Sequence, residues 1–364
     1  MTQRVYNFSA GPAAMPVPVL ESIQRDMLAL PGVGASILEI SHRSGTFVAI
    51  AEAAEANLRK LLSISDDYAV LFLQGGSRLQ FSMIPMNLLG EGQSADYILT
   101  GSWGNDALKE AKKEGETSVA WDGKSTNYDR LPKKGDLKLN PQAAYVHYTS
   151  NETIQGVQFQ SEPEVGDVPL VCDSSSEFLY KPLDVSKYGL IYACAQKNAG
   201  PSGVTVVIIR KDLLKKSDPN MPGYLNYQIH ADNGSMWNTP PTFGIYVLKL
   251  VTDWLLNDVG GLDAMYKRNQ DKAKLLYDVL DASNGFYAGH AQKEDRSLMN
   301  VTFRLPSDEL TDQFVGEAKK LSLTDLKGHR SVGGIRASIY NAMPVAGVEK
   351  LRDFMVEFKE KNAK

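Results

Sequence analysis

The sequence has little cysteine, little histidine and no long apolar run. It contains two cysteines and five histidines in 364 residues. Cys172 and Cys194 lie outside any Cys-x-x-Cys pair, in runs expected to form strands, so we expect buried free thiols and no metal site. No apolar run approaches the length of a membrane span, and the segment MTQRVYNFSAGP lacks the apolar stretch of a secretory signal. These absences lead us to expect a cytoplasmic protein that does not act at a membrane.

The sequence also lacks a strong charge of either sign and the common nucleotide-binding motifs. A net charge of -4 gives no general attraction to nucleic acid or acidic membranes, so an anion site must be a local cluster of cations. Neither G-x-G-x-x-G after a strand nor G-x-x-x-x-G-K-[ST] is present, which counts against a Rossmann or P-loop protein. At 364 residues the chain exceeds the usual size of one domain.

An acid and an amine follow two predicted neighbouring strands. Three short apolar runs, rich in β-branched residues and bounded by Gly, Pro or Ser, are typical of buried strands: Val168–Cys172, Leu190–Ala193 and Val204–Ile209. Asp173 ends the first run, and Lys197 lies in the turn after the second, 24 residues later. Open α/β sheets bind their ligands at such strand ends.

This pair suits pyridoxal phosphate (PLP) chemistry. A lysine forms a Schiff base with the cofactor aldehyde, and a carboxylate keeps the pyridine nitrogen protonated so that the ring draws electrons. The alternative is that Asp173 caps a turn and Lys197 is a solvated surface lysine. Lys197 favours the first interpretation because it follows a buried run and opens the turn Gly-Pro-Ser-Gly.

Strands and helices are predicted to alternate from residue 69 to about 210, which indicates a mainly parallel sheet covered by helices. Further strands are expected at Ala69–Leu73, Ala95–Leu99, Thr117–Ala120 and Ala143–His147, and helices at Val17–Leu30, Phe47–Leu62, Leu79–Leu89 and Trp103–Glu114. Residues 211–240 look irregular. Two helices should follow, at Thr242–Leu256 and Leu262–Leu280.

The rest of the chain, 285–364, predicts a small α+β domain. Its expected elements are the strands Leu298–Phe303 and Gly334–Ser338 and the helices Ser307–Leu321 and Val345–Lys359. We expect a large PLP-binding domain at 16–260. Residues 1–15, an extended arm, should join 261–364 in a small domain.

Polar turns after other strands offer ligand contacts. Gly75-Gly76-Ser77 lies between a strand and a helix, where free backbone N–H groups bind phosphate. Trp103 follows another strand and is placed to stack on a flat ring. Each has an ordinary alternative as a turn or a core residue.

The segment AQKNAGPSGVTVVIIR closely resembles the lysine segment of the phosphoserine aminotransferases, a family of class-V, fold-type I PLP enzymes. The resemblance covers essentially the whole chain, in order, through YNFSAGPAAMP, EISHRSGTF, LQGGSRLQFSMIPMNLL, TGSWGNDALKEAK, HYTSNETIQGVQF, NTPPTFGIY and GHRSVGGIRASIYNAMP. It implies the PLP-transferase fold type I and a transaminase that interconverts 3-phosphohydroxypyruvate plus L-glutamate with O-phospho-L-serine plus 2-oxoglutarate. Some members also accept 4-phosphohydroxythreonine in vitamin B6 synthesis.

The resemblance also implies a role for each matching residue. Lys197 would carry the cofactor and move the proton, Asp173 would pair with the pyridinium nitrogen, and Trp103 would stack on the ring. Thr153 would bond near the phenolic oxygen. The cofactor phosphate would be held by Gly76, Ser77, Arg78 and Gln196, and by Asn238 and Thr239 of the neighbouring subunit in a homodimer with shared active sites.

Substrate anions would meet a second group of residues. Arg336 would take the α-carboxylate through a bidentate fork. The distal phosphate or γ-carboxylate would meet His42, Arg43, His329 and Arg330. Two positions depart from the family. Cys194 replaces a small residue and is expected to face the core beneath the site, with slight crowding of the cofactor as the alternative. Ser77 replaces a glycine or alanine, and its hydroxyl would add a phosphate contact.

One further alternative stays within PLP chemistry. A cysteine desulfurase of the same fold needs an exposed reactive cysteine on a mobile loop, whereas both cysteines here are expected in strands. A fourth possibility, a non-catalytic protein that keeps the fold, has no support in the sequence, since every key position holds the expected residue type.

Overall fold

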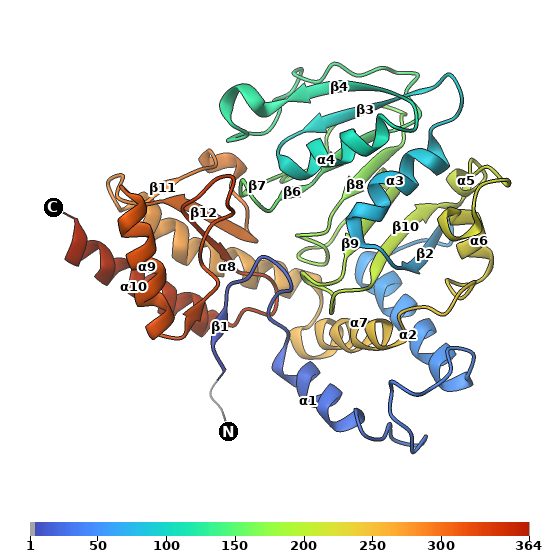
Figure 1. The fold of residues 1–364 in the computed structure, drawn as a ribbon, viewed down its shortest axis with the longest axis horizontal. Coiled ribbons are helices and arrows are strands. Elements are labelled where there is room, and N and C mark those ends of the chain that lie inside the picture. The colour runs from blue at the N-terminus through green and yellow to red at the C-terminus, as the bar shows by residue number, and fades with distance from the viewer. Residues whose placement is uncertain (1–3, 364) are drawn as a thin grey trace.

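The computed structural model describes residues 4–363, and its centre is a seven-stranded sheet (Figure 1). The strands lie in the order β2-β10-β9-β8-β5-β3-β4. In that order their bounds are Tyr68–Leu73, Thr205–Arg210, Leu190–Cys194, Leu170–Asp173, Val146–Thr149, Ser94–Leu99 and Glu116–Asp122.

All but one of these strands run in the same direction. Strands β9, β8, β5, β3 and β4 pair in parallel, whereas β10 is antiparallel to both β9 and β2. Because two reversals restore the direction, β2 runs the same way as β9. The expected mainly parallel sheet is therefore confirmed, and the carboxyl ends of β2, β3, β8 and β9 meet at one edge.

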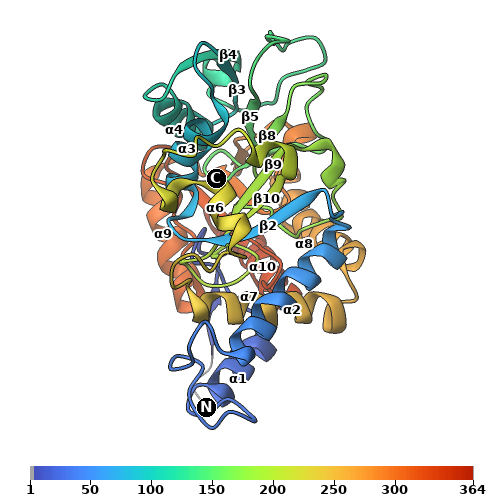
Figure 2. The same ribbon diagram turned by 90° about the vertical axis from the view of Figure 1, so that its right-hand side faces the viewer.

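Helices cover both faces of the sheet, as Figures 1 and 2 show. Successive side chains of a strand point to opposite faces, so Leu71 and Leu73 join one core while Val70 and Phe72 join the other. The first core packs under α3 (Gly76–Leu88) and α4 (Ser102–Ala111), and the second under α2 (Gly45–Leu62) and α7 (Thr242–Trp254). Helix α1 (Val17–Asp26) lies against α7.

A third core lies in the smaller α+β region beside the sheet. There β11 (Ala288–Gly289), β12 (Asn300–Arg304) and β14 (Ile335–Ser338) form a three-stranded sheet. The helices packed against it are α8 (Leu262–Asp281), α9 (Asp308–Lys320) and α10 (Val345–Asn362).

The N-terminal arm belongs to this third core, in the small region. Strand β1 (Tyr6–Asn7) pairs in parallel with β13 (Leu323–Thr324), and the Phe8 side chain is fully buried among the small-region residues. The arm thus starts against the C-terminal part of the chain before it crosses to the large sheet.

The predicted elements are present, with differences at their ends. Helix α1 ends at Asp26 and not at Leu30, since a turn closes where the Leu30 N–H donates to the Ala35 carbonyl. Strand β5 starts three residues later than predicted and reaches Thr149. The segment 211–240 is less irregular than expected: it contains α5 (Lys211–Leu214) and α6 (Tyr227–Asp232), and the Asn226 side chain caps α6 by accepting from the Ile229 N–H.

The hairpin of β6 (Asn151–Glu152) and β7 (Val157–Gln158) was not predicted, because each strand is only two residues long. Both cysteines are buried and free, as expected. Within residues 4–363, no helix is long and apolar enough to cross a membrane, and no three His, Cys, Asp or Glu side chains cluster as metal ligands would.

Candidate active site

A cavity of about 470 Å³ opens at the carboxyl edge of the large sheet. Ten of the residues singled out from the sequence line it: Gly76, Ser77, Arg78, Trp103, Thr153, Asp173, Gln196, Lys197, His329 and Arg336. They come from both the large sheet and the small region, so the fold gathers positions that lie up to 260 residues apart in the sequence.

Asp173 and Lys197 face this cavity from neighbouring strand ends. Asp173 ends β8, and Lys197 lies in the turn after β9, which pairs with β8. The Asp173 side chain is buried, and its Oδ1 accepts the Ser175 N–H at 3.0 Å. Burial raises the pKa of Asp173, while hydrogen bonds from Ser175 and the charge of Lys197 oppose the rise. This carboxylate favours a cationic partner in the cavity.

The N-terminal arm closes the cavity over Lys197. Ala10, Gly11 and Pro12 line it, and the Ala13 N–H donates to the Gln196 carbonyl at 2.9 Å. A Cβ placed on Gly11, whose φ is +148°, would lie 3.0 Å from both Cδ and Cε of Lys197. Glycine at this position therefore leaves room for the lysine side chain.

The helix α3 N-terminus forms one end of the cavity. Gly75 and Gly76 have φ of +89° and +63°, which glycine adopts easily, and no side chain caps the helix. The Ser77 N–H donates to Cys194 Sγ at 3.0 Å, and Ser77 Oγ lies 2.9 Å from both Cys194 Sγ and Ser175 Oγ.

The expectation that Cys194 faces the core beneath the site is wrong, because its thiol lines the cavity wall. The hydroxyl groups of Ser77 and Ser175 and the thiol of Cys194 therefore lie together at the N-terminus of α3, where the helix dipole is positive.

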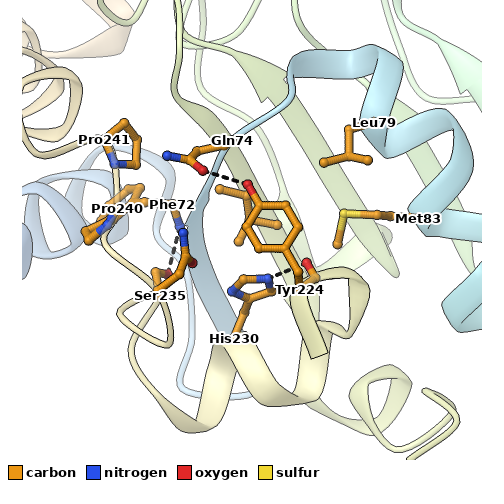
Figure 3. A pocket seen from close by; sticks show the side chains of 11 residues that line it. Phe72, Gln74, Leu79, Met83, Tyr224, His230, Ser235, Pro240 and Pro241 are labelled. Carbon is orange, nitrogen blue, oxygen red and sulfur yellow. Dashed lines mark hydrogen bonds between the residues drawn. The ribbon is translucent and has the colours of Figure 1, made fainter. Parts of the chain in front are cut away.

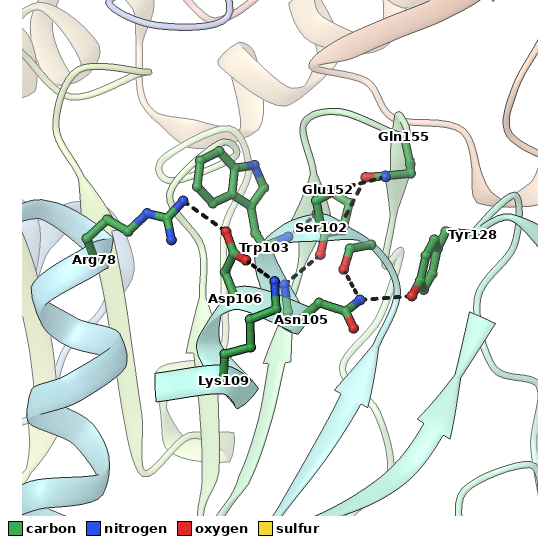
Figure 4. Close-up of polar contacts among 11 residues, drawn as sticks. Arg78, Ser102, Trp103, Asn105, Asp106, Lys109, Tyr128, Glu152 and Gln155 are labelled. Atoms are coloured by element: carbon green, nitrogen blue, oxygen red, sulfur yellow. Dashed lines mark hydrogen bonds and ion pairs between the residues drawn. The ribbon is translucent and has the colours of Figure 1, made fainter. Parts of the chain in front are cut away.

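Trp103 is the second residue of α4, and its indole lies in the cavity wall (Figure 4). The Arg78 guanidinium lies over the ring, 5.4 Å from its centroid, and pairs with Asp106 at 2.8 Å. Arg78 therefore already has a carboxylate partner, which reduces the charge that it can offer to a phosphate. Figure 4 also shows Glu152 beside Trp103, where its carboxylate accepts the backbone N–H groups of Trp103 and Gly104.

Two candidate cations come from the small region. Arg336, on β14, and His329 both line the cavity. Burial lowers the pKa of Arg336, and burial together with the charges of Arg336 and Arg330 lowers the pKa of His329. Arg330 is near enough to act on His329, yet its own side chain is exposed and outside the cavity wall.

The remaining predicted residues lie elsewhere in this chain. His42 and Arg43 are in the loop before α2 and do not line the cavity. Asn238 lines a different pocket, of only about 10 Å³, with Phe72, Gln74 and Pro240 (Figure 3). There Tyr224 donates to Gln74 Oε1 at 2.6 Å. Thr239 follows Asn238 in this same exposed stretch. One chain alone thus does not bring these four residues to the site.

Sequence reasoning missed the residues that support the site. Ser175, Glu152 and the Ala10–Pro12 arm each act on a predicted residue through the backbone or by close packing. Thr149 also lines the cavity, and its buried Oγ1 has no hydrogen-bond partner within the described residues. For Thr149 and Glu152 the sequence signal is the polar run Thr149–Thr153, which follows an apolar strand.

Comparisons with known proteins agree with this arrangement. The profile of the family described as Aminotransferase class-V matches residues 5–351. A phosphoserine aminotransferase of Rhodopirellula baltica is 61% identical over 363 residues, which cover 99% of this chain and 96% of the relative. The phosphoserine aminotransferase structure from Bacillus circulans subsp. alkalophilus has a TM-score of 0.97 at 49% identity and covers 99% of each chain.

A third match carries the cofactor in its name. The PLP-bound phosphoserine aminotransferase from Trichomonas vaginalis has a TM-score of 0.92 at 40% identity, covering 97% of this chain and 100% of the other. The family and its solved structures indicate pyridoxal phosphate as the cofactor. This chain therefore belongs to the class-V aminotransferases, and within them to the phosphoserine aminotransferase family.

Proposed function

We propose that this chain transfers an amino group between O-phospho-L-serine and 2-oxoglutarate, with 3-phosphohydroxypyruvate and L-glutamate as the other pair, in serine biosynthesis. The observation that carries the chemistry is the position of Lys197 and Asp173 at adjacent strand ends of one cavity. The substrates follow from the family, whose curated members match over the full length of the chain.

The cavity residues fit pyridoxal phosphate. Asp173 is buried, and no salt-bridge partner for it occurs in the part of the chain that the structure describes. It suits a protonated ring nitrogen, while the α3 N-terminus with Ser77 and Gln196 suits the phosphate. Trp103 would face the ring, and Thr153 would bond near the phenolic oxygen. We further propose that the large domain of 16–260 holds the cofactor while the small domain, 1–15 and 261–364, supplies substrate contacts.

When bound, pyridoxal phosphate draws electrons away from the Cα of the amino acid, so that the Cα proton becomes acidic. Lys197 would hold the cofactor covalently until the substrate amino group takes its place. Its freed Nζ would then take the proton from the substrate Cα and deliver it to C4′ of the cofactor. Asp173 would keep the ring nitrogen protonated throughout. The arm at Ala10–Pro12 would exclude water from Lys197.

Arg336 would fix the substrate α-carboxylate by two parallel hydrogen bonds, because a guanidinium matches a carboxylate in shape. His329 and Arg330, with His42 and Arg43, would hold the distal anion. Since His42, Arg43, Asn238 and Thr239 do not line the cavity of their own chain, we propose that a second copy supplies them. The assembly would then be a homodimer with shared sites, and we expect it to work in the cytoplasm.

The test is amino transfer with purified, cofactor-loaded protein. With 2-oxoglutarate as acceptor, O-phospho-L-serine should form glutamate with a kcat/KM at least about 10³-fold above that of L-serine. The phosphate brings roughly two charges and three acceptor oxygens that serine lacks. Alanine and aspartate are further controls, and 4-phosphohydroxythreonine tests a second phosphorylated substrate. Equal rates for serine and phosphoserine would overturn the assignment.

A further inference from the structure

Glu152 lies directly behind the cavity and has no charged partner in the part of the chain described. Its side chain is fully buried. Its Oε2 accepts the Trp103 N–H at 3.1 Å, and its Oε1 accepts the Gly104 N–H at 2.9 Å. Both oxygens are thus committed to the first turn of α4 (Figure 4).

This carboxylate replaces the local cap that α4 lacks. Gly101 precedes α4 and has no side chain that could accept hydrogen bonds from the free N–H groups of the first turn of the helix. A Cβ at Gly101 would lie 2.5 Å from Glu152 Cδ, so only glycine leaves room for the carboxylate. Gln155, from the same hairpin as Glu152, bonds to Ser102 through Oε1 at 3.5 Å and Nε2 at 3.1 Å.

The hairpin therefore fixes Trp103 relative to Thr153. Glu152 lies between Asn151 and Thr153, and both of these line the cavity. Through Glu152, the backbone that presents Thr153 also holds the backbone that presents the indole. On its other side the indole meets Arg78, which Asp106 holds in place.

We propose that Glu152 is a positioning residue, which holds the Trp103 ring at the distance from Thr153 that the cofactor ring requires. The inference rests on the proposed function in that Trp103 and Thr153 are taken to contact the cofactor. Glu152 itself would touch neither cofactor nor substrate.

The electrostatics of Glu152 indicate which variant to use. Burial raises the pKa of Glu152 to about 7, and the charges of Asp173 and Asp106 add to the rise, while the Gly104 and Trp103 amides oppose it. An ionised carboxylate can accept a hydrogen bond from each of the two backbone N–H groups, because neither of its oxygens carries a hydrogen. Glutamine keeps the volume of the side chain but turns one acceptor into a donor.

The experiment measures the dissociation constant of pyridoxal phosphate from apoprotein by equilibrium dialysis. We expect Glu152→Gln and Trp103→Phe each to weaken binding about tenfold, since about 1.4 kcal/mol corresponds to a factor of ten. In the double variant, Glu152→Gln should add less than about twofold to Trp103→Phe, because Glu152 acts through the indole. Gln155→Ala, which loses the contact to Ser102 alone, should stay within about threefold of the wild type.

Thermal unfolding of each apoprotein separates positioning from folding. If Glu152→Gln does not fold, Glu152→Asp takes its place, because aspartate keeps the charge but is one methylene too short to reach both amides. Fully multiplicative effects of the two substitutions, or a lower apoprotein Tm with unchanged cofactor affinity, would overturn the inference. If Trp103→Phe alone leaves affinity unchanged, the proposed role of Trp103 fails, and the inference fails with it.

Discussion

At the scale of single residues, the site depends on ionisable side chains that the fold buries, fully or partly, without a salt-bridge partner among the residues that the structure describes. Asp173 is buried and Arg336 is partly buried, and burial shifts the pKa of each group in the direction that favours its neutral form. Holding such groups ionised costs free energy that a charged ligand returns on binding. Both residues therefore favour a ligand with a cationic ring nitrogen and an anionic carboxylate.

The lysine that binds the cofactor covalently can be identified by chemical labelling. Borohydride reduction of the loaded protein, followed by peptide mapping, should place the phosphopyridoxyl group on Lys197, the lysine that lines the cavity. Lys197→Ala should fold normally and lose amino transfer by more than about 10³-fold, since it removes the proton-transfer group. A label on Lys181 or Lys187 instead would refute the assignment.

The two arginines should differ in what they recognise. Arg336→Leu should weaken both phosphoserine and glutamate by roughly 2–5 kcal/mol, because both substrates carry the α-carboxylate. Arg330→Leu should reduce the phosphoserine half-reaction more, since a phosphate carries about twice the charge of a carboxylate. Single-turnover rates with each amino acid make the comparison. Equal losses at Arg330 would show that the distal pocket does not discriminate by charge, and Arg43→Leu provides a second measurement.

At the scale of whole elements, helix α8 holds the turn that follows β14 through a buried amine. Lys272 Nζ donates to the carbonyls of Ile339, Tyr340 and Met343 at 2.8, 2.7 and 3.3 Å. In the same turn, the Asn341 N–H donates to Asn198, the neighbour of Lys197. Helix α8 is thereby linked, through the turn after β14, to Asn198 and so to the turn that contains Lys197.

The burial of this amine should make folding stability depend on pH. Burial, and secondarily Arg268, lowers the pKa of Lys272 from 10.5 to about 7. Between these values the unfolded chain binds more protons than the folded one, so this group makes stability rise with pH, by at most about 1.4 kcal/mol per unit. Denaturant unfolding at several pH values from 7 to 10 should therefore give a smaller slope for Lys272→Met than for the wild type.

A matched control lies on the same helix. Lys274 is exposed and pairs with Asp278, so Lys274→Met should leave the pH slope as in the wild type. If the curves for Lys272→Met and the wild type run parallel, the buried amine does not contribute this dependence.

The sequence predicts these elements well where a pattern is local. Apolar runs located β8, β9 and β10 to within two residues, and strand-end chemistry pointed to Asp173 and Lys197. It did not predict the hairpin β6–β7, whose two-residue strands leave no periodic pattern. The role of Glu152 was not predicted for a different reason. It accepts backbone amides 48 and 49 residues away in the sequence, and nothing in the local sequence distinguishes it from other acidic residues. Cys194 was misplaced because strand alternation alone does not tell which face meets a cavity.

At the scale of the whole molecule, the cavity of one chain lacks two of the residues predicted to bind the distal anion, His42 and Arg43. Lys197→Ala should be inactive and Arg43→Leu strongly impaired, yet mixtures of the two should be more active than either variant alone. Under the proposed sharing, one site in a hybrid dimer receives both native residues. Activity after mixing, unfolding and refolding is the measurement. A fully active monomer in dilute solution, or no recovery from any ratio of the two variants, would rule out sharing.

The pairing of β1 with β13 has a consequence for how the protein is made. Tyr6 and Asn7 leave the ribosome before their partners Leu323 and Thr324, which are translated more than 300 residues later. Until then the arm has no strand to join and Phe8 has no core to enter, so the bond between the Ala13 N–H and the Gln196 carbonyl has no support from the small region. The large sheet can fold during translation, since all its strands precede residue 211. A nascent chain would therefore carry an open lysine, and the site would close only after Leu323 and Thr324 have been synthesised.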